Sequence, residues 1–184
     1  MRLFVSINLK DEVMKEVRQI QQQLCVSEDA RMSPTRHVHI TLGFIGEVEP
    51  ESANRIGEAL RTLRFSPFEV VLARAGCFGT PKQPRVIWLG VEPREPLVEL
   101  HREVKEALEG VPAPGLSPGL FEPHITMARV KQVHAPRALQ RSVDAMVIPE
   151  LRIEVDGFSL MQSTLQPSGA TYTELNYFSA VSGE

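Results

Sequence analysis

Two short segments of the same design stand far apart in this sequence. Residues 39–42 read His-Ile-Thr-Leu and residues 124–127 read His-Ile-Thr-Met. Successive side chains of a β-strand point to opposite faces, so each histidine would share a face with the threonine two residues later, while the apolar residues face the core. If the two segments pack as a pair, two imidazoles and two hydroxyls converge on one cleft.

This set of side chains suits the cleavage of a phosphodiester, which needs a base for the nucleophile and an acid for the leaving oxygen. Histidine titrates near neutral pH, so His39 and His124 could hold opposite protonation states at one pH. Each could contribute on the order of 10²–10⁴-fold to the rate. The hydroxyls of Thr41 and Thr126 could donate to non-bridging phosphate oxygens, where charge must be stabilised. A site of this kind needs no metal and no cofactor.

The elements that must position these residues follow from hydrophobic periodicity and from turn residues. The periodicity predicts strands over 2–8, 38–45, 68–72, 86–91, 121–130, 147–161 and 170–179. It predicts helices over 11–24, 50–63, 96–108 and 136–143, and loops over 27–36, 79–85 and 110–120. One histidine segment lies in each of two halves with similar content, which indicates an α+β fold with two sheet-and-helix lobes. We expect residues 1–184 to form a single domain in which the two lobes are interleaved.

Composition excludes several classes of protein. With 184 residues, 42% hydrophobic and 23% charged, the chain is globular rather than disordered. A net charge of −3 excludes the basic footprint of a non-specific nucleic-acid binder, so an RNA substrate would have to be held locally. No apolar run approaches the roughly 18 residues of a membrane span. Cys25 and Cys77 are too few for a disulfide scaffold, and we interpret them as reduced thiols of a cytoplasmic, monomeric protein.

The paired His-x-Thr-x segments resemble the signature of the 2H phosphoesterases. More narrowly, the chain resembles the RNA 2′,3′-cyclic phosphodiesterases, also called 2′-5′ RNA ligases. The resemblance extends to residues 2–7, 84–91, 160–165 and 169–172. It implies a bilobal fold of two pseudo-symmetric lobes, made of mostly antiparallel sheet with helices outside, in which the histidines face each other across a central cleft.

The resemblance also implies an activity. Members of this family open the 2′,3′-cyclic phosphate at an RNA end to a 2′-phosphomonoester without a metal, and some join tRNA halves through a 2′-5′ linkage. By this resemblance His39 is the proton donor to the leaving 3′ oxygen, His124 is the proton acceptor that activates water, and Thr41 and Thr126 bind the phosphate. The partner would be RNA with a cyclic phosphate end, including tRNA fragments, or a cyclic nucleotide. From the residues alone, either histidine could be the acid.

Two further residues are candidates for the cleft. Arg129 matches a phosphate-binding position of the family, but strict alternation turns it away from His124. It can reach the cleft only if the strand bulges or twists near residues 127–128. Phe44 could stack on a nucleobase, whereas its alternation with Leu42 and Gly46 favours a position in the core.

Two other functions remain open. His37 and His39 could together ligate a metal ion in a metal-dependent hydrolase, although the sequence offers no matching second pair of ligands. Alternatively, the chain could bind RNA ends without turning them over. Metal analysis tests the first alternative, and incubation with a nucleoside 2′,3′-cyclic phosphate followed by chromatography tests the second.

Overall fold

The computed structural model describes residues 1–25, 28–116, 120–167 and 169–181. The strands in these residues belong to one sheet. The strand order is β7-β4-β5-β6-β3-β1-β8-β9, and β2 pairs with β6 outside this path. All of these pairings are antiparallel. The strands are β1 (Arg2–Asn8), β2 (Ala30–Pro34), β3 (His39–Glu47), β4 (Phe68–Thr80), β5 (Gln83–Glu92), β6 (His124–Val133), β7 (Arg152–Val155), β8 (Gly157–Gln166) and β9 (Gly169–Ser179). The helices are α1 (Asp11–Cys25), α2 (Pro50–Leu60), α3 (Glu95–Ala107) and α4 (Pro136–Asp144).

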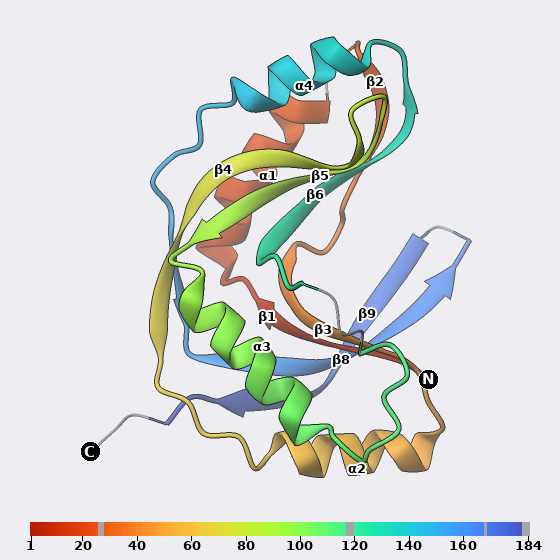
Figure 1. The fold of residues 1–184 in the computed structure, drawn as a ribbon, viewed down its shortest axis with the longest axis vertical. Coiled ribbons are helices and arrows are strands. Elements are labelled where there is room, and N and C mark those ends of the chain that lie inside the picture. Colours follow the sequence, from red (N-terminus) through yellow and green to blue (C-terminus); the bar gives the residue numbers. More distant parts are fainter. Residues whose placement is uncertain (26–27, 117–119, 168, 182–184) are drawn as a thin grey trace.

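The sheet divides into two halves that are interleaved along the chain (Figure 1). The β3 half consists of β1, β3, β8 and β9, with α2 and α3 outside; the β6 half consists of β2, β4, β5, β6 and β7, with α1 and α4 outside. Between β3 and β6 the register records one residue pair, Ile40 with Ile125. The expected α+β fold, with two lobes of antiparallel sheet and helices outside, is confirmed.

Several helices and strands form where periodicity and burial agree. In α1, Val17, Ile20 and Leu24 recur at helical spacing and are buried against the sheet. The five residues Leu3–Ile7 of β1 are all buried, which is the pattern of a strand covered on both faces. After α3, Gly110 has φ +78°, a left-handed conformation that favours glycine, at the start of the predicted loop 110–120.

Three predictions of local structure were wrong. Part of the predicted loop 27–36 is the strand β2, because its backbone pairs with β6 despite a polar sequence. The predicted loop 79–85 belongs mostly to a hairpin, in which β4 runs to Thr80 and β5 begins at Gln83. The predicted strand 147–161 starts only at residue 152 and is divided between β7 and β8. Residue 27 of one predicted loop and residues 117–119 of another lie outside the described residues.

None of the helices in the described part of the chain is long and apolar enough to cross a membrane.

Candidate active site

The junction of the two halves brings the two histidine segments together. Ile40 and Ile125 pair across β3 and β6, and both are fully buried. Continuing this antiparallel register places His39 opposite Thr126 and Thr41 opposite His124. All four side chains then lie on the face opposite the buried isoleucines, which is the arrangement that the repeated sequence predicts.

A cleft of about 650 Å³ lies on this face. His39, Thr41 and Thr126 line it, together with Phe44 and Arg129. The ring of His124 does not belong to this lining set and is half-buried beside the cleft. Its charge nevertheless lowers the pKa of His39, so the two imidazoles lie within electrostatic reach of each other.

The two histidines are oriented by the same backbone contact. Nδ1 of His39 lies 2.9 Å from the carbonyl oxygen of His37, and Nδ1 of His124 lies 2.7 Å from that of Glu122. A carbonyl oxygen only accepts, so Nδ1 carries the hydrogen in both rings. In each neutral imidazole, Nε2 is therefore the nitrogen with a lone pair for proton exchange.

Aromatic rings enclose each histidine. The ring of His39 lies 5.2 Å from that of Phe4 and 5.7 Å from that of Tyr172. The ring of His124 lies 4.8 Å from that of Phe78 and 6.3 Å from that of Trp88. These rings displace water from the imidazoles, and this desolvation disfavours the charged form.

The pKa values of both histidines are lowered. Burial is the largest cause in each case, and it brings the pKa of His39 to about 4. The hydrogen bonds to His37 and Glu122 oppose this effect because they stabilise the imidazolium. Without bound substrate, burial therefore favours the neutral form of both imidazoles.

Each histidine strand contains a β-bulge at the same position relative to its histidine. Along β3, Thr41 pairs with Ser6 and Gly43 with Val5, so Leu42 is the extra residue. Along β6, residues 126 and 128 pair with consecutive residues of β5, so Met127 is the extra residue. A bulge adds one residue to the strand and reverses the alternation beyond it.

The bulges turn Phe44 and Arg129 toward the cleft. Each lies five residues after its histidine. In a regular strand, side chains five residues apart lie on opposite faces. The strand thus has the bulge near residues 127–128 that Arg129 needs in order to reach the cleft, and Arg129 lines the cleft. Phe44 is 59% exposed and lines the cleft, so the alternative that it packs in the core is wrong.

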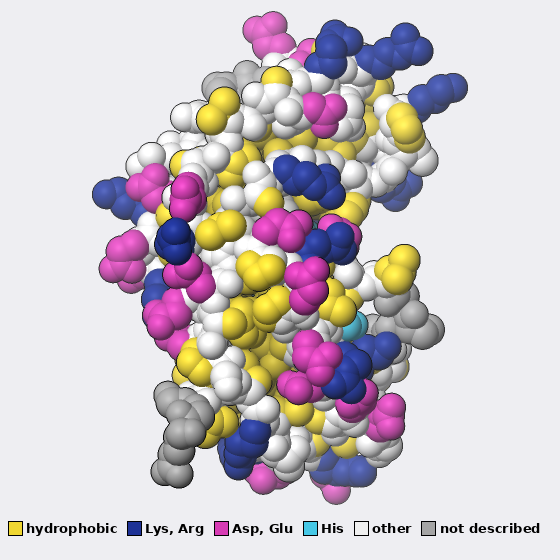
Figure 2. All heavy atoms as spheres, turned by 60° about the vertical axis from the view of Figure 1, so that its left-hand side comes forward, with side chains coloured by type: hydrophobic (Ala, Val, Ile, Leu, Met, Phe, Trp, Pro, Cys, Tyr) yellow, Lys and Arg dark blue, Asp and Glu magenta, His cyan; other side chains and the backbone are white. Residues whose placement is uncertain are grey.

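The cleft carries local positive charge. Its lining includes Arg2, Arg36, Arg129 and Lys131, and no aspartate or glutamate of the described residues belongs to the lining set. The outer face shown in Figure 2 differs, because acidic and basic side chains are interspersed across it. The net charge of −3 is thus compatible with an anion-binding cleft.

The alternative of a metal site at His37 and His39 has no supporting cluster of ligands in the part of the chain that the structure describes. His37 lines the cleft, and its ring lies 5.2 Å from that of Tyr172. Within the described ranges, no group of three or more histidine, cysteine, aspartate or glutamate side chains could hold a metal ion.

Sequence reasoning did not identify several residues of the cleft. Tyr172 reaches it from β9 and Phe4 from β1, and both stand in segments that carried the family resemblance. Arg36 and Lys131 were not recognised as cleft residues. For Lys131 the signal was available, because it follows Arg129 by two residues and shares its face once the bulge is placed.

Comparison with known proteins identifies the family. Residues 9–166 match the model of a family described as the 2′-5′ RNA ligase superfamily. A protein of Archaeoglobus fulgidus named RNA 2′,3′-cyclic phosphodiesterase is 34% identical, over 97% of this chain and 99% of its own length. A protein of the same name from Thermotoga maritima is 33% identical, over 95% and 93% of the two chains.

A solved structure agrees with these sequence matches. A crystal structure of a Thermus thermophilus protein superposes with a TM-score of 0.76 at 29% identity, and covers 100% of both chains. The resemblance inferred from the paired histidine segments is therefore confirmed. The chain belongs to the 2′-5′ RNA ligase superfamily.

Proposed function

We propose that this chain hydrolyses the 2′,3′-cyclic phosphate at RNA ends to a 2′-phosphomonoester, by general acid and base catalysis from His39 and His124 and without a metal ion. The observation that carries the proposal is the convergence of the two segments. Two imidazoles with equivalent Nδ1 contacts flank two hydroxyls and an arginine at one junction. The names of the relatives support the substrate class.

The reaction exchanges one P–O bond for another. Nε2 of His124 takes a proton from water, whose oxygen attacks phosphorus. The bond from phosphorus to the 3′ oxygen breaks, and Nε2–H of His39 protonates that oxygen. The products are a 3′-hydroxyl and a 2′-phosphomonoester. If a 5′-hydroxyl of RNA attacks in place of water, the same steps form a 2′-5′ linkage.

Charge on the phosphoryl oxygens increases in the transition state. The hydroxyls of Thr41 and Thr126 stand on the same face as the imidazoles and donate hydrogen bonds to those oxygens. Arg129 adds a guanidinium turned toward the cleft by the bulge at Met127. Donors fixed by a sheet need no reorganisation as the charge develops.

A bound phosphate also favours the charged imidazole that the acid role requires. An anion within about 4–6 Å of an imidazole favours the charged form. Substrate binding therefore raises the pKa of both histidines from their lowered values. The first proton taken up by the complex makes one imidazole the acid and leaves the other as the base.

Product analysis tests the proposal. The chain is incubated with a nucleoside 2′,3′-cyclic phosphate, with and without EDTA, and the products are separated by chromatography. The proposal predicts the 2′-phosphate as the product, at a rate that EDTA does not change. Strong inhibition by EDTA would support a metal-dependent hydrolase. Binding without turnover would leave only the RNA-end binder.

A further inference from the structure

The bulges of the two histidine strands place extra residues, Leu42 and Met127, whose backbone groups fall outside the regular ladder of the sheet. Both are fully buried. A bulge interrupts the ladder locally, so the carbonyl oxygen of its extra residue needs a partner from elsewhere. In both halves a side chain from the helix on the outer side of the strand donates to that oxygen, and in the β6 half a backbone N–H donates to it as well.

Gln21 of α1 holds the bulge of β6. Its Nε2 lies 2.6 Å from the carbonyl oxygen of Met127 and 2.8 Å from that of Thr35, so both amide hydrogens are donated. The backbone N–H of Thr35 donates to the same Met127 oxygen at 2.9 Å. Gln21 is 7% exposed, whereas the neighbouring glutamines of the helix are exposed.

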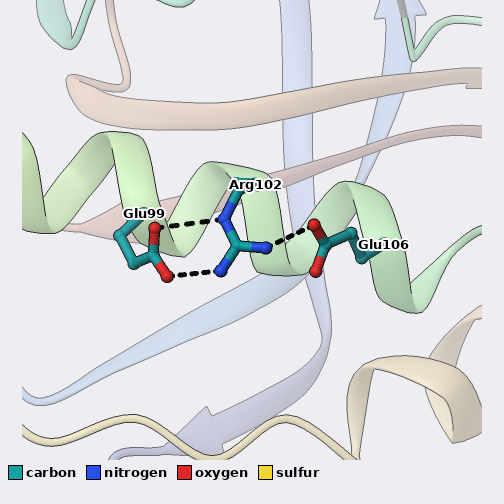
Figure 3. A network of polar contacts seen from close by, with 3 residues as sticks. All are labelled: Glu99, Arg102 and Glu106. Carbon is teal, nitrogen blue, oxygen red and sulfur yellow. Dashed lines mark hydrogen bonds and ion pairs between the residues drawn. The ribbon is translucent and has the colours of Figure 1, made fainter.

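His101 of α3 holds the bulge of β3. Its Nδ1 donates to the carbonyl oxygen of Leu42 at 2.5 Å, and its ring stacks on Phe121 at 4.2 Å. The stacking fixes the plane of the imidazole and thus the direction of Nδ1–H. The neighbouring Arg102 is exposed and forms ion pairs with Glu99 and Glu106 on the same helix (Figure 3).

We propose that Gln21 and His101 are positioning residues, each of which fixes the cleft side chain two residues beyond the bulge. Gln21 acts through Arg129, and His101 acts through Phe44. The inference rests on the proposed function for its readout, since Arg129 would contact the phosphate and Phe44 the nucleobase. Neither Gln21 nor His101 belongs to the lining of the cleft that contains His39.

The two residues should affect different kinetic constants. Arg129 meets charge that develops in the transition state, so loss of the Gln21 donor should lower kcat. Displacement of a catalytic group by about 1 Å can lower a rate on the order of 10²-fold. Phe44 would hold the base equally in the ground state and in the transition state, so loss of the His101 donor should raise KM and leave kcat nearly unchanged.

The variants Gln21→Met and His101→Phe remove the donors while keeping comparable size, and His101→Phe also keeps a ring to stack on Phe121. His101→Asn is the rescue variant, because the Asn amide nitrogen occupies nearly the place of Nδ1. Gln23→Met and Arg102→Gln are matched controls at exposed positions of the same two helices. Steady-state kinetics on a nucleoside 2′,3′-cyclic phosphate are measured for each, with circular dichroism to establish folding.

Double variants separate positioning from a general structural role. In the Arg129→Ala background, Gln21→Met should cause little further loss of kcat; in the Phe44→Ala background, His101→Phe should not raise KM further. The inference would be overturned if Gln21→Met or His101→Phe had the same effect in its alanine background as in the wild-type chain. A folded Gln21→Met variant with normal kcat would also overturn it. If Gln21→Met does not fold, the His101 variants test the inference. Failure of His101→Asn to restore KM would then overturn the inference. A wild-type chain without turnover would instead refute the proposed function.

Discussion

His39 and His124 make the same hydrogen bond in the two halves of the sheet. In each ring Nδ1–H donates to the carbonyl oxygen of the residue two positions earlier, at 2.9 Å and 2.7 Å. The acceptors His37 and Glu122 lie just before β3 and β6, so each contact joins residues two positions apart and fixes the tautomer of the ring without substrate. It is the property that makes both rings competent at Nε2, and it explains why either could serve as acid or base.

Replacement of either histidine by alanine should remove most of the activity and leave the fold intact. Each ring contributes one proton transfer, and loss of a general acid or base lowers the rate on the order of 10²–10⁴-fold. Turnover of a nucleoside 2′,3′-cyclic phosphate by His39→Ala and His124→Ala is the measurement. His134→Ala, at an exposed position before α4, is the matched control. Near-normal turnover in either variant would reject the role of that histidine.

The residual activity of these variants should also assign the two roles. The base must be deprotonated and the acid protonated, so they give the acidic and the alkaline limb of the pH–rate profile. If His39 is the proton donor, His39→Ala loses the alkaline limb and His124→Ala loses the acidic one. Burial lowers the pKa of His39 to about 4, so as the donor this ring must gain its proton in the complex with substrate. Loss of the opposite limbs would exchange the roles.

The pH profiles of kcat/KM and kcat should differ. Burial lowers the pKa of both imidazoles in the unliganded chain, so the maximum of kcat/KM should lie below the ordinary histidine pKa of about 6.5. Bound phosphate raises both values, which moves the maximum of kcat to higher pH. Because the two rings interact, each limb reports a value for the pair. Coincident profiles centred above pH 7 would contradict this account.

The threonine hydroxyls should contribute mainly to kcat. Thr41→Val and Thr126→Val keep the shape and β-propensity of the side chain but remove the donor. A hydrogen bond to a charged group is worth about 1.5–3 kcal/mol, so each change should lower kcat roughly 10- to 100-fold. Thr41→Ser and Thr126→Ser keep the hydroxyl and serve as controls. If the valine variants match the serine variants, the hydroxyls do not bind the phosphate.

The cations of the cleft should matter more for RNA than for a mononucleotide. Arg36→Gln and Lys131→Gln each remove a charge that lines the cleft and lies outside the two histidine segments. Their kcat/KM should fall for an oligonucleotide with a cyclic phosphate end, with a weaker dependence on salt, because fewer counterions are released. Lys82→Gln, at an exposed position in the β4–β5 turn, is the control. An equal decrease for a mononucleotide would assign these cations to the reacting phosphate instead.

The repeated segments made the centre of the site predictable, because alternation in a strand follows directly from spacing. Segments with strong periodicity, such as α1 and β1, were also predictable. The bulges were not, since Leu42 and Gly43, like Met127 and Ala128, are compatible with an unbroken strand. Tyr172 meets His39 only through the pairing of β1, β8 and β9, which the local sequence does not encode. The polar strand β2 likewise depends on its partner β6.

The central claim is that both imidazoles act on one phosphorus atom, and a crystal structure with a bound nucleoside 2′-phosphate tests it most directly. The account predicts Nε2 of His39 and Nε2 of His124 within about 2.6–3.2 Å of the phosphate oxygens or of a water that bridges to them. It predicts the hydroxyls of Thr41 and Thr126 on the same anion. A phosphate that contacts one imidazole while the other remains enclosed by its aromatic neighbours would contradict the claim.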